Sequence, residues 1–401
     1  MRAFPRDDYL DSLRRVHERD LVRIITGVRR CGKSTLLELY REELVASGAD
    51  PRSILTINFE DAANDALRSP DAFLLHVLEQ VEVNSVRYLH VDEVQELGDW
   101  SRVVNSLRVN PGLEICVTGS NATMFSGESL TYLAGRYIEL HMLPLSLAEL
   151  RRFRKDSGSS AEAYRTWMDV GGFPAAVLAG DPDITDQINS SLFDSIFTRD
   201  IATRGQIRDT EVFLRVARFV FDNAGSPLST NKISSHLKSQ GYSSSPESVD
   251  RYLGLMEDAH LIYRCSRYDT QGKQWLKTNG KFYFVDPGLR TALLGSRDVN
   301  RGHDLENMVY LELRRRRYRV STGHSKNAEI DFVATRGKDT AFIQVAYSTD
   351  DASTLERELR PLAANADCAR TYLITADRIP PSTGSVTWID AFEFLAGAPL
   401  D

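Results

Sequence analysis

The strongest constraint on the fold of this chain comes from residues 27–34, which read GVRRCGKS. They fit the G-x-x-x-x-G-K-[ST] pattern of a phosphate-binding loop. The apolar run 21–26 precedes them and the helical pattern 35–40 follows. A loop of this kind needs both flanks, because the N–H groups and positive dipole at the start of a helix hold the phosphates. The stretch therefore predicts a phosphate site between a strand and a helix, rather than a tight glycine turn.

Backbone N–H groups do most of the binding in such loops, so we credit Arg29 and Arg30 with position more than with charge. We expect Lys33 to neutralise the β- and γ-phosphates of a bound nucleotide. The residues predicted to contact the nucleotide are Gly27, Val28, Arg29, Arg30, Cys31, Gly32, Lys33, Ser34 and Thr35.

Two acidic residues, Asp92 and Glu93, close the apolar run 86–91. In phosphate-loop proteins, Mg²⁺ is held by the loop Ser/Thr and by an Asp at the end of a neighbouring strand. Ser34 and Asp92 fit these roles, and two protein ligands suffice because Mg²⁺ keeps several waters. Glu93 is a candidate to orient, or take a proton from, the water that attacks the γ-phosphate. The alternative is a solvated acidic turn.

A polar cluster, residues 118–121 (TGSN), follows another apolar run. Ligands of parallel sheets bind beyond the carboxyl ends of the strands, so this cluster is predicted to face the phosphates. We expect Ser120 or Asn121 to hydrogen-bond the γ-phosphate or the attacking water. A plain turn is the alternative.

The overall composition favours a globular chain without a membrane span. The 401 residues carry a net charge of −7, which lowers the expectation of a nucleic-acid partner, because such proteins usually show a basic footprint. No apolar run reaches membrane-spanning length. The four cysteines are scattered, as in reduced proteins without a disulfide framework or a zinc site. We therefore expect a cytoplasmic protein with no membrane partner.

Alternating strand and helix patterns predict an α/β domain with a parallel sheet in residues 1–153. A polar break at 154–160 ends it. Residues 161–300 show helices at 212–222, 230–240 and 246–258, then strands at 261–268 and 281–286. This order resembles a winged helix. Its third helix has four acids and one base, which argues against insertion into DNA, although the hairpin is basic.

Residues 301–401 form a further small α/β pattern that resembles a restriction-endonuclease-like, or PD-(D/E)xK, nuclease domain. Glu306 on a helix and Asp331 on a strand match its first two carboxylate positions. Gln344 stands at the third acidic position, and Ala346 stands where the lysine belongs. We therefore expect a degenerate nuclease-like domain in which Glu306 and Asp331 form a polar cluster that stabilises the fold. Metal binding by Glu306, Asp331 and Gln344 stays open at this point. The alternative is that Lys326 or His324 takes over the role of the missing lysine.

Several motifs together resemble the AAA-type ATP-binding proteins of prokaryotes, which carry an N-terminal AAA+ ATPase domain and a C-terminal domain of unknown function. The resemblance covers nearly the whole chain and rests on residues 27–34, 91–95, Trp100, 118–120, 133–136, 171–174, 282–289, 329–332 and 343–346.

This resemblance implies an ATPase that uses ATP and Mg²⁺ and acts between subunits, so we expect a homo-oligomer. An arginine from a neighbouring subunit often completes such a site. Arg136 is the candidate for this role, and Arg199 is a weaker candidate for nucleotide sensing. A structural salt bridge is the alternative for both. The expected catalytic residues are Lys33, Glu93, Asn121 and Arg136.

We expect ATP binding and hydrolysis, coupled to the C-terminal domains and to an unidentified protein partner. Two alternatives stay open at this point. One is a nucleotide-gated protein-binding switch with little turnover. The other is a DNA-processing ATPase or nuclease.

Overall fold

The computed structural model describes residues 4–17, 19–110, 112–122, 131–269, 274–295, 300–325, 328–365 and 369–400. The chain forms two compact units. The first contains residues 1–142 with 258–260, and the second contains residues 143–257 and 261–401.

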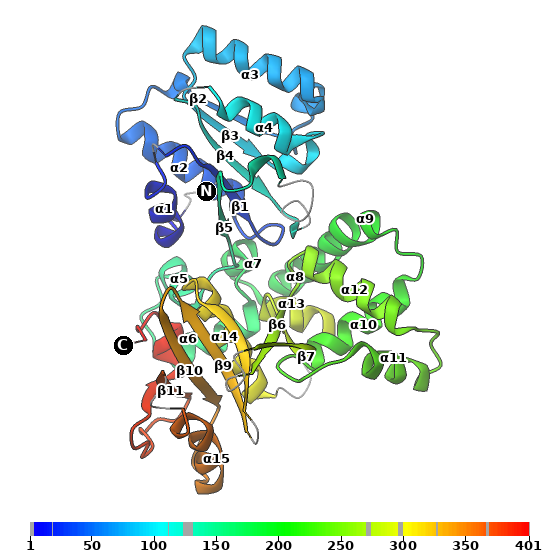
Figure 1. Cartoon of the computed structure of the whole chain (residues 1–401), viewed down its shortest axis with the longest axis vertical. Helices are drawn as coiled ribbons and strands as arrows, with labels where there is room; N and C mark the ends of the chain where they lie inside the picture. Colours follow the sequence, from blue (N-terminus) through cyan, green and yellow to red (C-terminus); the bar gives the residue numbers. More distant parts are fainter. Residues whose placement is uncertain are drawn as a thin grey trace. The chain divides into compact units, whose positions relative to one another are not determined.

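The first unit is built on a five-stranded sheet with the order β2-β3-β4-β1-β5 (Figure 1). All of its pairings are parallel, which confirms the sheet predicted from the sequence. The strands are β1 (Val22–Thr26), β2 (Ile54–Asn58), β3 (Tyr88–Asp92), β4 (Glu114–Gly119) and β5 (Tyr137–His141). The helices are α1 (Asp7–Arg14), α2 (Lys33–Ala46), α3 (Pro70–Asn84) and α4 (Trp100–Arg108).

The core of this unit explains why its strands read as continuous apolar runs. Every residue of β1 is buried, as expected for a strand inside a parallel sheet. One charge lies in this core. Arg23 is 2% exposed, and its guanidinium donates to the carbonyl of Val16 at 2.9 Å and to Glu114. The buried charge is thus both paired and hydrogen-bonded, as stable burial requires.

The second unit begins with a helical region. Its helices are α5 (Leu147–Arg154), α6 (Ser160–Val170), α7 (Pro174–Ala179), α8 (Pro182–Ser195), α9 (Thr203–Gly205), α10 (Thr210–Asp222), α11 (Thr230–Ser239), α12 (Pro246–Asp258) and α13 (Pro287–Leu294). A π-helical segment, Ile196–Ala202, lies between α8 and α9. Helices α10, α11 and α12 precede the β6–β7 hairpin, in the order predicted from the sequence.

A seven-stranded mixed sheet forms the rest of the second unit, with the order β12-β11-β10-β9-β8-β6-β7. Its strands are β6 (Ile262–Asp269), β7 (Gln274–Phe284), β8 (Arg319–Ser325), β9 (Ala328–Arg336), β10 (Asp339–Ala346), β11 (Arg370–Thr375) and β12 (Thr387–Asp390). The helices α14 (Arg301–Arg315), α15 (Ala352–Ala363) and α16 (Ala391–Leu395) accompany it.

The β6–β7 hairpin belongs to this sheet, because β6 pairs in parallel with β8. Residues from 161–300 and from 301–401 therefore share one sheet, which the sequence did not reveal. A winged-helix identity for the first of these ranges stays a prediction, as does a nuclease-like identity for the second.

Four consecutive arginines, residues 314–317, stand at the end of α14. Arg314 donates to the hydroxyl of Tyr310 at 3.1 Å. Arg315 donates to the carbonyl of Pro144 at 2.9 Å, and Arg316 pairs with Glu312 at 2.7 Å. Three of the four arginines are thus used in holding the second unit together.

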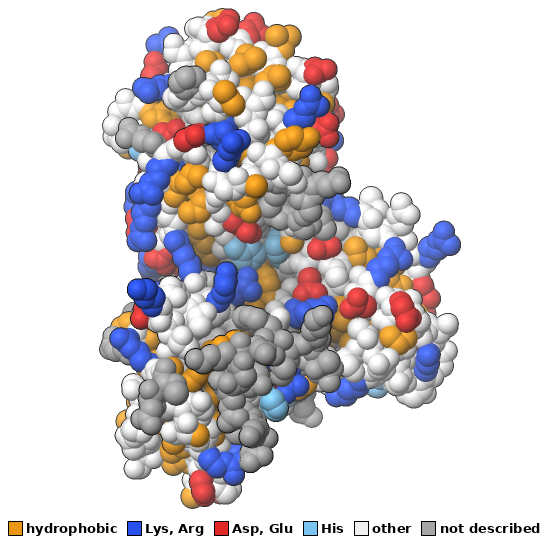
Figure 2. Space-filling view, viewed as in Figure 1, with side chains coloured by type: hydrophobic (Ala, Val, Ile, Leu, Met, Phe, Trp, Pro, Cys, Tyr) orange, Lys and Arg blue, Asp and Glu red, His pale blue; other side chains and the backbone are white. Residues whose placement is uncertain are grey.

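The surface carries mixed charge. On the face shown in Figure 2, basic and acidic side chains are interspersed over the described parts of each unit. Among the described residues, no helix combines the length and the apolar character needed to cross a membrane.

Candidate functional site

The phosphate-binding loop leaves the carboxyl end of β1 in a conformation that requires glycine. Gly27 has φ +140°, and a Cβ atom there would lie 2.1 Å from the carbonyl oxygen of Met142. Gly32 has φ +108° and is the N-cap residue of α2. With no side chain at this cap, the first N–H groups of α2 are left to bind an anion. The local backbone is that of a phosphate cradle.

Lys33, the first residue of α2, is held within the loop. Its Nζ donates to the carbonyl oxygens of Gly27 at 3.0 Å and Val28 at 3.2 Å, and the residue is 3% exposed. Arg6 supports the same loop, because its Nη1 donates to the carbonyl of Cys31 at 3.2 Å. No sequence pattern indicated this role for Arg6, which lies just before α1.

A hydroxyl–carboxylate pair lies beside the loop. Asp92, the last residue of β3, accepts a hydrogen bond from the Thr118 hydroxyl. Burial raises the pKa of the Asp92 carboxyl above its usual value, and the nearby hydroxyls of Ser34 and Thr118 oppose that shift. The structure thus brings the predicted metal ligands Ser34 and Asp92 together. A hydroxyl and a carboxylate are hard oxygen donors, which is the chemistry that fits Mg²⁺.

Glu93 is fixed by three contacts. It adopts a left-handed backbone conformation with φ 55° and is 6% exposed. Its N–H donates to Thr118 Oγ1 at 3.1 Å. Its Oε2 accepts from Ser120 Oγ at 3.2 Å and from the Gln95 amide. The carboxylate is therefore oriented by residues from the ends of two neighbouring strands.

Two of these partners were not predicted individually. Thr118 connects Asp92 with the backbone of Glu93, and Gln95 holds the Glu93 carboxylate. The sequence indicated only that the carboxyl ends of the two strands meet at one edge of the sheet. In the structure, the pairing of Val91 with Val117 brings these ends together.

The other predicted residues of the first unit lie in different places. Asn121 is 3% exposed and follows β4 at the edge where the loop lies. The Arg29 side chain pairs with Glu60, and its Nη1 donates to Glu60 Oε1 at 2.8 Å. Arg136 is exposed and precedes β5, with its carbonyl accepting from the N–H of Val22 at 2.9 Å. Arg136 therefore lies at the amino-terminal ends of the strands, whereas the loop that follows β1 lies at their carboxyl ends.

The second unit holds the predicted carboxylate cluster. Glu306, Asp331 and Gln344 line one pocket, and Ala346 lies in it as well. Lys281 also lines this pocket and pairs with Glu306 and Asp331, a role that the sequence had not indicated. His324 does not line it, and Lys326 lies outside the described residues. Arg199 lies in the π-helical segment of this unit.

Comparisons with known families identify two regions of the chain. A family model described as an AAA domain matches residues 19–151. A second model, described as a domain of unknown function (DUF8612), matches residues 161–300.

Two uncharacterized proteins are similar over most of their length. One, from Haemophilus influenzae, is 37% identical over 346 residues, which are 85% of this chain and 86% of the relative. The other, from Methanocaldococcus jannaschii, is 28% identical over 356 residues, which are 84% of this chain and 77% of the relative.

A solved structure shares the fold. The Walker-type ATPase of Pyrococcus abyssi is 15% identical and has a TM-score of 0.51. The match covers 73% of this chain and 96% of that protein.

Proposed function

Because this chain belongs to the family that includes the uncharacterized H. influenzae protein and carries an AAA domain, we propose that it is a Mg²⁺-dependent ATPase. One observation carries this proposal. The Ser34–Asp92 pair and the oriented Glu93 carboxylate lie together beside a phosphate-binding loop. In phosphoryl transfer, the Ser34–Asp92 pair is suited to holding Mg²⁺, and the Glu93 carboxylate is suited to orienting the attacking water.

Binding is assigned to the loop and to Lys33. The N–H groups at the start of α2 hold the phosphates, and the Lys33 ammonium is the point charge that neutralises the β- and γ-phosphates. Its two carbonyl contacts keep it inside the loop before nucleotide arrives. Ser34 and Asp92 hold Mg²⁺, which supplies further positive charge to the phosphate oxygens.

Hydrolysis is assigned to Glu93. Its carboxylate accepts a proton from the water that attacks the γ-phosphorus, so that the bond to the ADP oxygen breaks and phosphate leaves. Gln95 and Ser120 fix the orientation of the acceptor oxygen. We assign Asn121 to the γ-phosphate or the attacking water.

Completion of the site is assigned to a second copy of the chain. Arg136 lies at the sheet edge opposite the loop, so it suits a site in a neighbouring subunit better than the site of its own chain. This supports a homo-oligomer in which Arg136 stabilises transition-state charge.

The second unit is proposed to respond to the nucleotide state. We retain a winged-helix-like module before Asn300 and a degenerate PD-(D/E)xK-like domain after it, both supported by element order. Coupling of ATP hydrolysis to these parts and to a protein partner is part of the proposal. A cytoplasmic location stays a prediction from the sequence.

Nucleotide binding by Lys33→Ala tests this function. Loss of a charge-assisted contact of this kind costs about 1.5–3 kcal/mol, so the affinity for MgATP should fall roughly 10–100-fold in calorimetry. Lys238→Ala, an exposed lysine on α11, is the matched control and should bind as the wild type does.

An MgATP affinity of Lys33→Ala equal to that of the wild type would show that the phosphate loop does not bind the nucleotide. Tight binding by the wild type without measurable turnover would instead favour a nucleotide-gated switch.

A further inference from the structure

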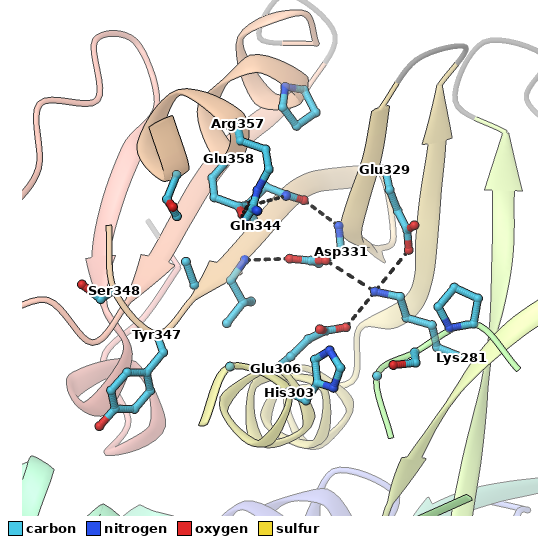
Figure 3. Close-up of a pocket in the computed structure, with 18 of the residues that line it drawn as sticks. Lys281, His303, Glu306, Glu329, Asp331, Gln344, Tyr347, Ser348, Arg357 and Glu358 are labelled. Carbon is cyan, nitrogen blue, oxygen red and sulfur yellow. Dashed lines mark hydrogen bonds and ion pairs between the residues drawn. The ribbon is translucent and has the colours of Figure 1, made fainter. Parts of the chain in front are cut away.

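The carboxylate pocket of the second unit is open and has a volume of about 640 Å³. Two elements, α14 and β9, bring the acidic side chains that surround Lys281 (Figure 3). Helix α14 supplies Glu306, while Glu329 and Asp331 come from alternate positions of β9 and therefore lie on the same face. Lys281 of β7 points into the middle of these carboxylates.

The ammonium of Lys281 is coordinated by all three acids. Its Nζ lies 3.0 Å from Glu306 Oε1, 3.2 Å from Glu329 Oε1 and 3.5 Å from Asp331 Oδ1. Two of the N–H donors of the ammonium are hydrogen-bonded, to Glu306 and Asp331, while Glu329 contributes an ion pair. Burial alone would lower the pKa of Lys281, but the three carboxylates raise it above its ordinary value. The side chain is therefore a permanent cation.

The Lys281 position is fixed by the fold. Asn307, next to Glu306 on α14, exchanges two hydrogen bonds with the backbone of Phe284 in β7, at 2.9 and 3.0 Å. Tyr283 of the same strand donates its hydroxyl to Glu306 Oε1 at 2.6 Å. These contacts clamp α14 to β7 and thereby place the ammonium against the acids.

The second carboxylate oxygen of Asp331 and its backbone N–H are also engaged. Asp331 Oδ2 accepts from the N–H of Val345 at 3.0 Å, and its own N–H donates to Gln344 Oε1 at 2.7 Å. Gln344 in turn donates to Glu358 at 2.6 Å. Among the described residues, no group of three or more His, Cys, Asp or Glu side chains is arranged to hold a metal ion. The carboxylates are arranged around an ammonium instead.

We propose that Lys281 is an internal cation that fills a divalent-cation position between Glu306, Glu329 and Asp331. The pocket of the wild-type protein consequently binds no metal ion. Carboxylate oxygens are the ligands that Mg²⁺ and Mn²⁺ prefer. Removal of the ammonium leaves three acids without their counter-ion, which is strongly unfavourable in a buried site. A divalent cation relieves this repulsion, so the cluster becomes a metal site when Lys281 is lost.

Mn²⁺ binding to nucleotide-free protein tests the proposal. Lys281→Met keeps the length of the side chain and removes its charge. We expect it to gain one Mn²⁺ site, detected by electron paramagnetic resonance, that is absent from the wild type. Saturating Mn²⁺ should raise its Tm by about 5 °C more than that of the wild type. Both proteins contain the phosphate loop, so any metal bound there cancels in the comparison.

Two further variants serve as controls. Lys281→Arg keeps a cation and should stay insensitive to Mn²⁺. In Lys281→Met/Asp331→Asn, one carboxylate is removed as well, and the gained Mn²⁺ site should be lost. A folded Lys281→Met protein with no additional Mn²⁺ site would overturn the proposal.

The wild-type protein tests the same inference if Lys281→Met does not fold. The wild type should bind no Mn²⁺ in this pocket, so Asp331→Asn should leave its Mn²⁺ binding unchanged. Loss of a Mn²⁺ site in Asp331→Asn, or Mn²⁺-dependent DNA cleavage that this variant abolishes, would overturn the proposal. Neither outcome depends on Lys33, so the ATPase assignment stands or fails separately.

Discussion

At the scale of single residues, Thr118 connects the two acids of the proposed ATP site. Its hydroxyl donates to Asp92 and accepts from the N–H of Glu93. Thr118 is fully buried, so water cannot replace either bond. The residue therefore orients both the proposed metal ligand and the backbone that carries the proposed acceptor of the water proton.

Thr118→Val tests this positioning role. The substitution keeps the shape but removes both hydrogen bonds, and loss of a residue that orients a metal ligand typically costs 10–100-fold in metal affinity. We expect the Mg²⁺ concentration that gives half-maximal ATP turnover to rise about 10-fold or more. Thr118→Ser keeps the hydroxyl and should stay near the wild type. Equal Mg²⁺ dependence of the valine variant and the wild type would show that Thr118 is only structural.

At the scale of secondary-structure elements, Asp286 ties the start of α13 to the turn after α6. Its carboxylate accepts from the N–H of Leu289 at 3.2 Å and from that of Gly172 at 2.6 Å. The acid is 1% exposed. Burial raises its pKa from the usual 3.8 to about 6, although backbone hydrogen bonds oppose the shift.

This raised pKa predicts how the stability of the second unit depends on pH. Between pH 3.8 and about 6, the folded state keeps a proton that the unfolded state releases. The free energy of unfolding therefore falls as pH rises through this window, by roughly 3 kcal/mol in total. Asp286→Asn does not titrate, so the wild-type stability minus the variant stability should fall from pH 4 to pH 7 in urea unfolding. A pH-independent difference would exclude Asp286 as the source.

Local patterns predicted the elements better than they predicted the contacts. The loop at 27–34 could be found because its glycines, its lysine and both flanks are adjacent in sequence. Thr118 could not be assigned a partner, because its role depends on the register between β3 and β4. Lys281 was missed for the same reason. It lies 25 residues before Glu306 and 50 before Asp331. Only the pairing of β6 with β8 and the packing of α14 against β7 bring these residues together.

At the scale of the whole molecule, the proposal requires one subunit to complete the ATP site of another. Arg136→Ala and Lys33→Ala should each be inactive in ATP turnover. Mixed and reassembled, they should recover activity, because an intact loop in the first variant then faces Arg136 of the second. Mixing Lys33→Ala with Glu93→Gln is the control and should recover nothing, since both lesions affect the same site. A mixture no more active than its parts would exclude Arg136 as a residue that acts between subunits.

The central claim is that the Glu93 carboxylate drives ATP hydrolysis at a site formed by the phosphate loop, Ser34 and Asp92. Steady-state ATP turnover of Glu93→Gln, measured beside calorimetric ATP binding, tests it most directly. Glutamine has nearly the size and shape of glutamate and removes only the charge, so MgATP affinity should stay within a few-fold of the wild type. Turnover should fall about 100-fold or more, the contribution typical of general-base catalysis. Wild-type turnover in Glu93→Gln would contradict the account.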